Sequence, residues 1–330
     1  MTTRHLLDLR AGVPWTDAHR AVLTAAAGAA WGNPLHPGSE GRRAATWLEA
    51  AAATVRSLSG YQHVGFLPNR ETALDLALEL FPGRPAIAAA THRRSVLLRC
   101  QTVLPVDHDG LVHWSASGLP VVQAANEETG VIDPTPTSPH VLDASNAFGR
   151  SPALPHAPAL LADAAAWGAP GGVCLLLSDI PIPTHTPAPV PLVAVAVQAL
   201  AEAWAPMAER AARTAAAMAR FEADVLASVP DVQFHGQHRI AHIRSFSVLH
   251  LDAETLTRAL DEQGYVVGSG SACVADGTPS HVLAAMGVVT HGNVRLALPI
   301  EMEPTVLDDF VPVLATTVRR LREEAGVADL

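Results

Sequence analysis

The sequence contains no lysine. All 22 residues in the combined lysine and arginine count are arginines, whereas average usage would place about 20 lysines in a chain of 330 residues. Coding bias is one explanation, because alanine, arginine, proline and glycine are all abundant. Whatever its cause, the absence excludes any reaction in which a lysine side chain of this protein forms a Schiff base.

Cysteines, secretory signals and long apolar runs are also scarce. The three cysteines, Cys100, Cys174 and Cys273, lack paired-ligand spacing, which argues against a disulfide framework and against a zinc ribbon. The longest apolar runs, such as residues 190–204, are shorter than the roughly 18 to 20 residues that cross a bilayer. Because the N-terminus has no secretory apolar core, we predict a cytoplasmic protein.

Basic charge and metal-ligand spacing are missing too. The formal net charge of −10 argues against direct nucleic-acid binding, because neutralising phosphates requires clustered cations. The 16 histidines are interpreted as scattered surface or satisfied core residues, so no metal site is predicted.

What the chain does have is a large apolar fraction, 49% of its residues against 16% charged, as expected for a globular protein with a sizeable core. Strand-like and helix-like segments alternate through the first two thirds, which predicts a mostly parallel sheet. The strand-like segments are residues 63–68, 85–90, 119–126, 140–144, 159–165 and 172–178, and the helix-like segments are 70–81 and 93–100.

A change of composition marks a domain boundary. The proline-rich segment 178–191 cannot hold a helix, and it leads into an alanine-rich helical pattern over about 192–228. The rest of the chain has the pattern of a smaller α+β unit. We predict a large domain over 14–205 and a small domain over 206–330 together with 1–13.

Six motifs then occur in an order that resembles one family. They are GNPLHPGSEGRRA (32–44), QAANEETGVIDP (123–134), VLDASNAFGR (141–150), WGAPGGV (167–173), GSGSACVADGTPSHVLAAMG (268–287) and GNVRLALP (292–299). Their order and spacing resemble the cysteine desulfurases, a class V aminotransferase-like group of fold type I enzymes that depend on pyridoxal phosphate (PLP).

The resemblance implies the α/β fold of PLP-dependent transferases, with a mostly parallel seven-stranded sheet, helices on both faces, and a smaller α+β domain. It also implies a homodimer that binds cysteine through PLP and passes the sulfur to a loop cysteine as a persulfide.

Four positions keep the residue type of the family. Cys273, in a loop of the small domain, falls on the persulfide-forming cysteine. Arg295 falls on the arginine that binds the substrate carboxylate, and Asn126 on a substrate-binding asparagine. Asp143 falls on the aspartate that keeps the pyridine nitrogen of PLP protonated.

The cofactor lysine is not kept. Alignment of the turn at Ala169 and Pro170 places Ala166 at the lysine position. The resemblance therefore implies that the covalent link to PLP is lost, together with the base that moves protons between substrate and cofactor. Asp163 falls beside this position, where it would put a like charge near the phosphate.

Other cofactor contacts of the family change as well. Arg70 falls in the phosphate-binding loop, and Arg93 falls on the ring-stacking histidine, beside His92. Glu127 replaces the second asparagine of an Asn-Asn-Glu run, and Asn146 replaces a glutamine. We therefore expect no bound cofactor.

Three hypotheses follow. The first is a pseudoenzyme without PLP that acts as partner subunit or scaffold in sulfur trafficking, as a homodimer or as a heterodimer with an active cysteine desulfurase. The second is a persulfide carrier or sulfurtransferase that uses Cys273 and delivers sulfur to an acceptor protein for iron-sulfur assembly or to a tRNA-thiolation enzyme. The third is residual PLP-dependent activity of desulfurase or aminotransferase type, with His92 or another group as base.

Overall fold

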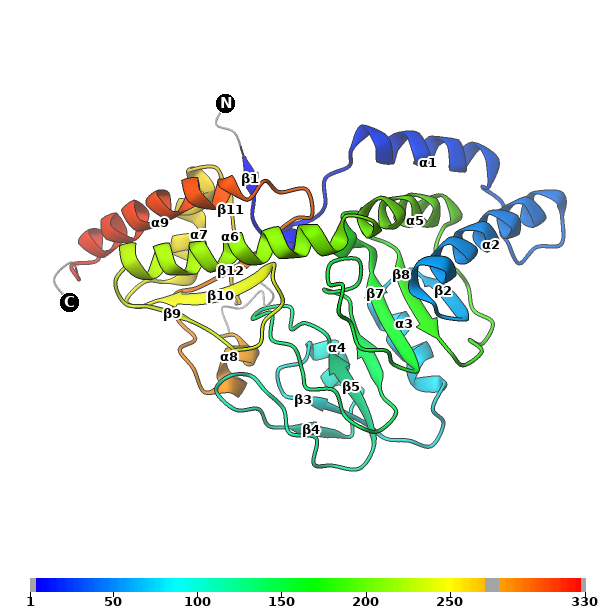
Figure 1. Ribbon diagram of the computed structural model, residues 1–330, viewed down its shortest axis with the longest axis horizontal. Helices are drawn as coiled ribbons and strands as arrows, with labels where there is room; N and C mark the ends of the chain where they lie inside the picture. The colour runs from blue at the N-terminus through cyan, green and yellow to red at the C-terminus, as the bar shows by residue number, and fades with distance from the viewer. Residues whose placement is uncertain (1–3, 271–278, 328–330) are drawn as a thin grey trace.

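A mostly parallel seven-stranded sheet forms the centre of the larger part of the molecule (Figure 1). The structure is a computed structural model that describes residues 4–270 and 279–327. The strand order is β2, β8, β7, β6, β5, β3, β4, in which β8 runs antiparallel to both neighbours. The strands are β2 His63–Leu67, β3 Ala86–Ala89, β4 Thr102–Leu104, β5 Leu119–Gln123, β6 Val141–Asp143, β7 Ala159–Asp163 and β8 Cys174–Ser178. The predicted fold class is confirmed.

Helices cover both faces of this sheet because its strands carry apolar side chains on both faces. In β7, Leu160 packs into the core that α5 covers, whereas Leu161 packs into the core that α3 covers. Both α1 and α2 pack against α5. The helices of this part are α1 Asp17–Ala29, α2 Ser39–Ser59, α3 Arg70–Glu79, α4 Arg94–Leu97 and α5 Val190–Trp204.

A second, smaller core surrounds the stacked and tilted rings of Phe221, Phe246 and Phe310. Its strands are β1 His5–Leu6, β9 Val232–Phe234, β10 Ile243–Val248, β11 Tyr265–Val266 and β12 Asn293–Ala297, and its helices are α6 Met207–Ser228, α7 Ala253–Glu262, α8 His281–Met286 and α9 Thr305–Glu324. Because β1 pairs with β11, the N-terminal segment joins this part before it crosses to α1.

The helix predicted over 192–228 is wrong, because the chain forms two helices there. α5 ends at Trp204 and α6 begins at Met207, with a bend of 74° between them. Pro206 explains the break, since proline lacks an N–H and its ring clashes with the preceding turn. The segment predicted as helical over 93–100 forms a helix only over Arg94–Leu97.

No single helix within the described ranges is long and apolar enough to cross a membrane. By length and composition alone, α5 and α6 pass that test only when they are joined across their bend.

The carboxyl ends of the parallel strands form the edge of the sheet at which open α/β folds place their ligands. Asp143 ends β6 and Asp163 ends β7. Two short 3-10 helices lie beside them, η1 (Leu9–Ala11) from the N-terminal segment and η2 (Ala164–Trp167), which directly follows β7.

Candidate functional site

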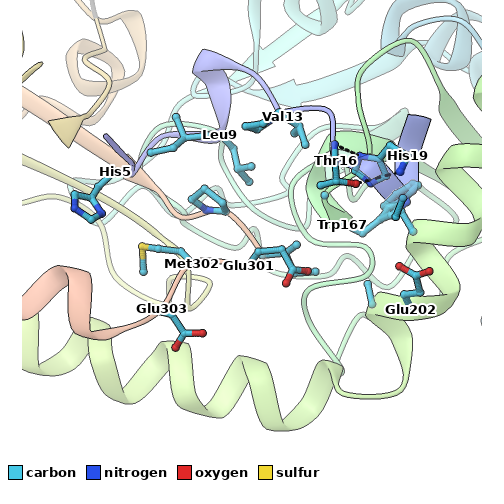
Figure 2. A pocket seen from close by; sticks show the side chains of 18 of the residues that line it. His5, Leu9, Val13, Thr16, His19, Trp167, Glu202, Glu301, Met302 and Glu303 are labelled. Carbon is cyan, nitrogen blue, oxygen red and sulfur yellow. Dashed lines mark hydrogen bonds between the residues drawn. The ribbon is translucent and has the colours of Figure 1, made fainter. Parts of the chain in front are cut away.

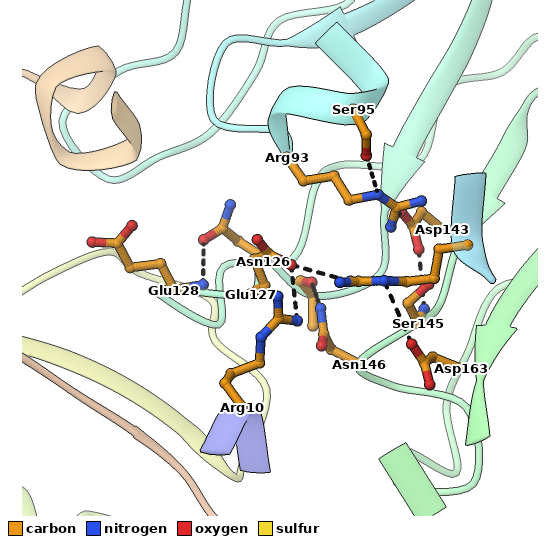
Figure 3. Close-up of polar contacts among 12 residues, drawn as sticks. Arg10, Arg93, Ser95, Asn126, Glu127, Glu128, Asp143, Ser145, Asn146 and Asp163 are labelled. Atoms are coloured by element: carbon orange, nitrogen blue, oxygen red, sulfur yellow. Dashed lines mark hydrogen bonds and ion pairs between the residues drawn. The ribbon is translucent and has the colours of Figure 1, made fainter. Parts of the chain in front are cut away.

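Three arginines and three carboxylates meet at this edge of the sheet (Figure 3). Arg93, just before α4, donates from Nη1 to Oδ2 of Asp143, and both side chains are buried. Arg70, at the start of α3, lies 3.1 Å from Glu127 and 3.4 Å from Asp163. Arg10 of η1 approaches the same Glu127 oxygen at 3.0 Å. These six residues are called the arginine–carboxylate cluster below.

The cluster keeps Glu127 and Asp143 ionised despite their burial. Burial alone would raise the pKa of Glu127, but Arg10 and Arg70 hold it at about 2. Burial would likewise raise the pKa of Asp143, and Arg93 holds that group at about 2. Three guanidinium groups therefore face three carboxylates, and the cluster is balanced in charge.

His92 lies against this cluster as a neutral imidazole. Burial lowers the pKa of His92 to about 4. Its Nδ1 accepts the backbone N–H of Arg93 at 2.9 Å, which places the proton on Nε2. That nitrogen is 3.8 Å from Oδ2 of Asp143, beyond hydrogen-bond length.

Ala166 lies in η2, where the alignment places the cofactor lysine. Asp163 begins this turn by accepting the N–H of Ala165 at 3.1 Å. Ala166 is buried, and its carbonyl accepts a hydrogen bond from Arg150 at 3.3 Å. The next residue, Trp167, is buried and donates from Nε1 to the carbonyl of Ala196 on α5 at 2.8 Å.

The residues of this site do not fit PLP. The Asp143 carboxylate, which would hold the pyridine nitrogen, is already paired with Arg93. A phosphate would add nearly two negative charges to a cluster in which the charges already balance. At the N-terminus of α3, the Asn69 side chain already accepts the N–H of Thr72 at 2.8 Å.

The cavity that remains beside the cluster is also too small to hold PLP. The cavity between the cluster and the loop after β6 has a volume of about 40 Å³ and is lined in part by Glu127, Asn146, Asp163 and Ala166. Pockets that hold cofactors and other small molecules measure roughly 300–1,000 Å³.

Arg295, predicted to bind a substrate carboxylate, is paired with a carboxylate of its own chain. Its Nη2 donates to Oδ2 of Asp8 at 2.7 Å, and both side chains are buried. Asp8 precedes η1, so the N-terminal segment contributes both this carboxylate and Arg10.

Asn126 and Asn146 have structural partners at this edge. The Asn126 amide donates to the carbonyl of Thr91 at 2.7 Å, and its oxygen accepts the N–H groups of Glu128 and Thr129. Asn146 donates to the carbonyl of Ala125 at 3.2 Å. The substrate role of Asn126 stays a prediction.

Cys273 lies outside the described residues. On either side of that segment, Gly270 donates its N–H to Asn293 at 2.8 Å, and Ser280 donates to Oε2 of Glu128 at 2.7 Å. The described ranges contain no group of three or more histidine, cysteine, aspartate or glutamate residues arranged to hold a metal ion.

The sequence did not reveal the roles of Asp8, Arg10 and Glu128. One signal in the sequence pointed to the cluster: opposite charges occur at positions that align with cofactor contacts of the family. These positions are Arg70, Arg93, Glu127 and Asp163. Such paired substitutions indicate a cluster of ion pairs, and not four independent losses of a cofactor contact.

Comparisons with known proteins point to one family. Residues 184–310 match the family model described as aminotransferase class-V. A segment of 108 residues is 31% identical to the cysteine desulfurase IscS of Dictyoglomus turgidum, and this match covers 31% of the present chain but only 27% of that relative.

Solved structures extend the likeness in fold to nearly the whole chain. A NifS-like protein has a TM-score of 0.80 at 17% identity and covers 96% of this chain and 100% of its own. The NifS-like protein of Rickettsia africae ESF-5 has a TM-score of 0.80 at 18% identity, covering 95% and 99%. At these identities the structures show the fold alone. The matched family model, the related segment and the order of the motifs agree in their similarity to the aminotransferase class-V and cysteine desulfurase proteins.

Proposed function

We propose that this protein is a cytoplasmic, cysteine desulfurase-like pseudoenzyme that works without PLP as a partner subunit or scaffold in sulfur trafficking. One observation carries the proposal: the arginine–carboxylate cluster uses the groups that would contact the cofactor, with Arg93 on Asp143 and Arg70 on Glu127 and Asp163. The whole sequence contains no lysine that could bind PLP as a Schiff base, and Ala166 stands at the aligned position.

Exposed large apolar side chains support a role through association. Trp15, Trp31, Leu35 and Trp47 are exposed, Trp31 by 68% and Leu35 by 56%, and they lie in or beside α1 and α2. Tryptophan is enriched where proteins contact one another. We propose that this face contacts a second subunit of the same fold, either another copy of this chain or an active cysteine desulfurase.

Cofactor binding tests the proposal directly. Protein produced with PLP in excess should show, after desalting, no stoichiometric absorbance band at roughly 330–430 nm. A matched control is an active cysteine desulfurase treated in the same way. A stoichiometric band from this protein would overturn the proposal.

A second candidate function is a persulfide carrier that uses Cys273. It is favoured by the anchoring of Gly270 and Ser280, the described residues on either side of that segment, to Asn293 and Glu128. In this reaction the Cys273 thiolate would attack the outer sulfur of a donor persulfide, and the donor cysteine would leave as a thiolate. The acceptor would belong to iron-sulfur assembly or tRNA thiolation.

Transfer of radiolabelled sulfur from an active desulfurase tests this second function. Label should reach the wild-type protein and should be lost in Cys273→Ala. Cys100→Ala is the control, because Cys100 is a half-buried thiol with a pKa that burial raises to about 11. Equal labelling of the wild type and Cys273→Ala would exclude a carrier role for Cys273.

A further inference from the structure

A cavity lies beside Trp167, at the end of η2 (Figure 2). Its volume is about 650 Å³. Four segments line it: the N-terminal segment from Arg4 to His19, Trp167 with Gly168, the end of α5, and residues 299–306. This volume falls in the range of roughly 300–1,000 Å³ that is typical of small-molecule sites. It is called the Trp167 cavity below.

The walls of the Trp167 cavity are mostly apolar and partly fixed. Leu9, Val13, Ile300 and Val306 contribute aliphatic surface, and Trp167 contributes its indole. Because the indole N–H is bonded to the carbonyl of Ala196 on α5, the ring is held in one orientation. Such a preformed apolar wall binds the body of a ligand at little cost in ordering.

The charge on this cavity is negative. Glu202, Glu301 and Glu303 line it, and in Figure 2 their carboxylates lie on the side opposite the N-terminal segment. Within the described ranges, no ion pair involves any of the three. Glu202 accepts one hydrogen bond from the uncharged Gln198, at 2.9 Å.

The basic groups nearby are engaged elsewhere. Arg4 is paired with Asp261, and the His5 ring stacks on Tyr265 with centroids 5.2 Å apart. His19 completes the capping box of α1 with Thr16. Arg150 attracts Glu301 from the protein interior, but its guanidinium donates to the carbonyls of Ala166 and Leu298. Arg210 is a further basic group nearby, since it donates to the carbonyl of Ala203 in the cavity wall at 3.2 Å. The three glutamates outnumber Arg150 and Arg210, so negative charge is in excess beside the apolar wall.

We infer that the Trp167 cavity binds a small organic cation with an apolar body. The body lies against Leu9, Val13 and Trp167, and the cationic group, a protonated amine for example, lies among Glu202, Glu301 and Glu303. This inference does not depend on the proposed function, because none of these residues belongs to the arginine–carboxylate cluster. The ligand would nonetheless contact that region from behind, since Leu9 lines both this cavity and the small cavity of about 40 Å³.

Three probes with one apolar body test the inference. Titration calorimetry with 3-phenylpropylamine, 3-phenylpropan-1-ol and 3-phenylpropionate compares a cation, a neutral molecule and an anion. The amine should bind saturably, at least about tenfold more tightly than the carboxylate, because opposite charge favours one and like charge disfavours the other. Equal binding of amine and carboxylate, or no saturable binding of the amine at millimolar concentration, would overturn the inference.

Two sets of variants locate the binding. The triple change Glu202→Gln, Glu301→Gln and Glu303→Gln should remove the preference for the amine over the alcohol. The charge-matched control changes three exposed glutamates elsewhere, Glu49, Glu209 and Glu262, to glutamine and should retain that preference. If both triple variants behave alike, the carboxylates of the cavity do not select the ligand.

A steric variant separates the cavity from the rest of the surface. Ala18 is exposed and lines the cavity, so Ala18→Trp should obstruct the cavity without disturbing the core. The affinity for 3-phenylpropylamine should fall by about tenfold or more. Ala27→Trp on the same helix is exposed and does not line the cavity, and it should bind as wild type does. Retained binding in Ala18→Trp would place the amine elsewhere.

Sedimentation of the same samples must show one oligomeric state. If amine binding followed a change of oligomeric state, the cavity would belong to a protein interface and the inference would be overturned.

Discussion

At the scale of single residues, the pair of Arg93 and Asp143 illustrates how an arginine can take over the contacts of a cofactor. Asp143 is a buried anion, and such a group requires a cation or several donors. In the family that cation is the protonated pyridine ring. Here Arg93 donates to Asp143, so the carboxylate is satisfied by the chain itself.

Removing Arg93 should therefore be costly. We expect Arg93→Met to lower the free energy of unfolding by about 3–5 kcal/mol, because it leaves Asp143 as an unpaired buried anion. Urea denaturation measures the change. Arg94→Met is the control, since Arg94 is exposed beside it and should change stability by less than about 0.5 kcal/mol. Adding Asp143→Leu to Arg93→Met should restore much of the lost stability. If Arg93→Met alone lost no more stability than Arg94→Met, the ion pair of Arg93 and Asp143 would contribute nothing to stability.

The same residues predict how stability depends on acid. Glu127 and Asp143 have ordinary pKa values of 4.5 and 3.8, and both are held at about 2 in the fold. A carboxyl with a lowered pKa stabilises the fold above its ordinary value and loses this contribution as pH falls through the lowered one. The free energy of unfolding should therefore fall steeply as the pH drops from about 5 toward 2.

Urea denaturation of Glu127→Gln at several pH values checks this. The variant should be less stable than wild type at pH 6, and its stability should fall less between about pH 5 and pH 3. Glu209→Gln, an exposed control, should follow the wild-type curve. An acid dependence of Glu127→Gln identical to that of wild type would contradict the assignment of the lowered pKa to Glu127.

At the scale of elements, the beginning of α3 is where a phosphate-binding loop of the family would lie. Asn69 caps this helix, and its side chain accepts from both the N–H and the hydroxyl of Thr72, at 2.8 and 2.9 Å. The helix terminus is thus satisfied by its own chain. We expect Asn69→Ala to destabilise the protein by about 1 kcal/mol in thermal or urea denaturation. Asn69→Asp keeps the acceptor and should stay within a few tenths of a kcal/mol of wild type, and equal effects of the two changes would show that capping is not what Asn69 contributes.

The elements themselves were largely predictable, and the residues that join them were not. Apolar runs such as 159–165 and 172–178 predict buried strands because both faces of the sheet are covered. The alanine-rich helical periodicity continues through Pro206 and so conceals the break between α5 and α6, although proline is itself a break signal.

The candidate site was predictable only in part. Alignment located Ala166, Arg93 and Asp143, since motifs preserve order along the chain. The pairing of Asp8 with Arg295 joins residues 287 positions apart, and no local pattern specifies such a contact. Only the tertiary fold, in which β1 pairs with β11 beside β12, brings these two side chains together.

At the scale of the whole molecule, the apolar surface on α1 and α2 predicts association. Trp31, between α1 and α2, is 68% exposed and Trp47, on α2, is 37% exposed, and large apolar side chains are costly to leave in water. We expect the protein to form dimers, with itself or with an active cysteine desulfurase, and expect Trp31→Arg with Trp47→Arg to disrupt them. Sedimentation velocity, on the chain alone and mixed with the desulfurase, measures both.

An exposed apolar residue outside α1 and α2 serves as the control. Leu226 on α6 is 58% exposed and lies in the other part of the molecule, so Leu226→Arg alters charge and apolar surface without touching α1 or α2. Dimers that persist in Leu226→Arg and dissociate in the double tryptophan variant would assign the interface to α1 and α2. Monomers of wild type under every condition would contradict the partner-subunit role, whereas the binding of an organic cation in the Trp167 cavity would be unaffected, because neither Trp31 nor Trp47 lines it.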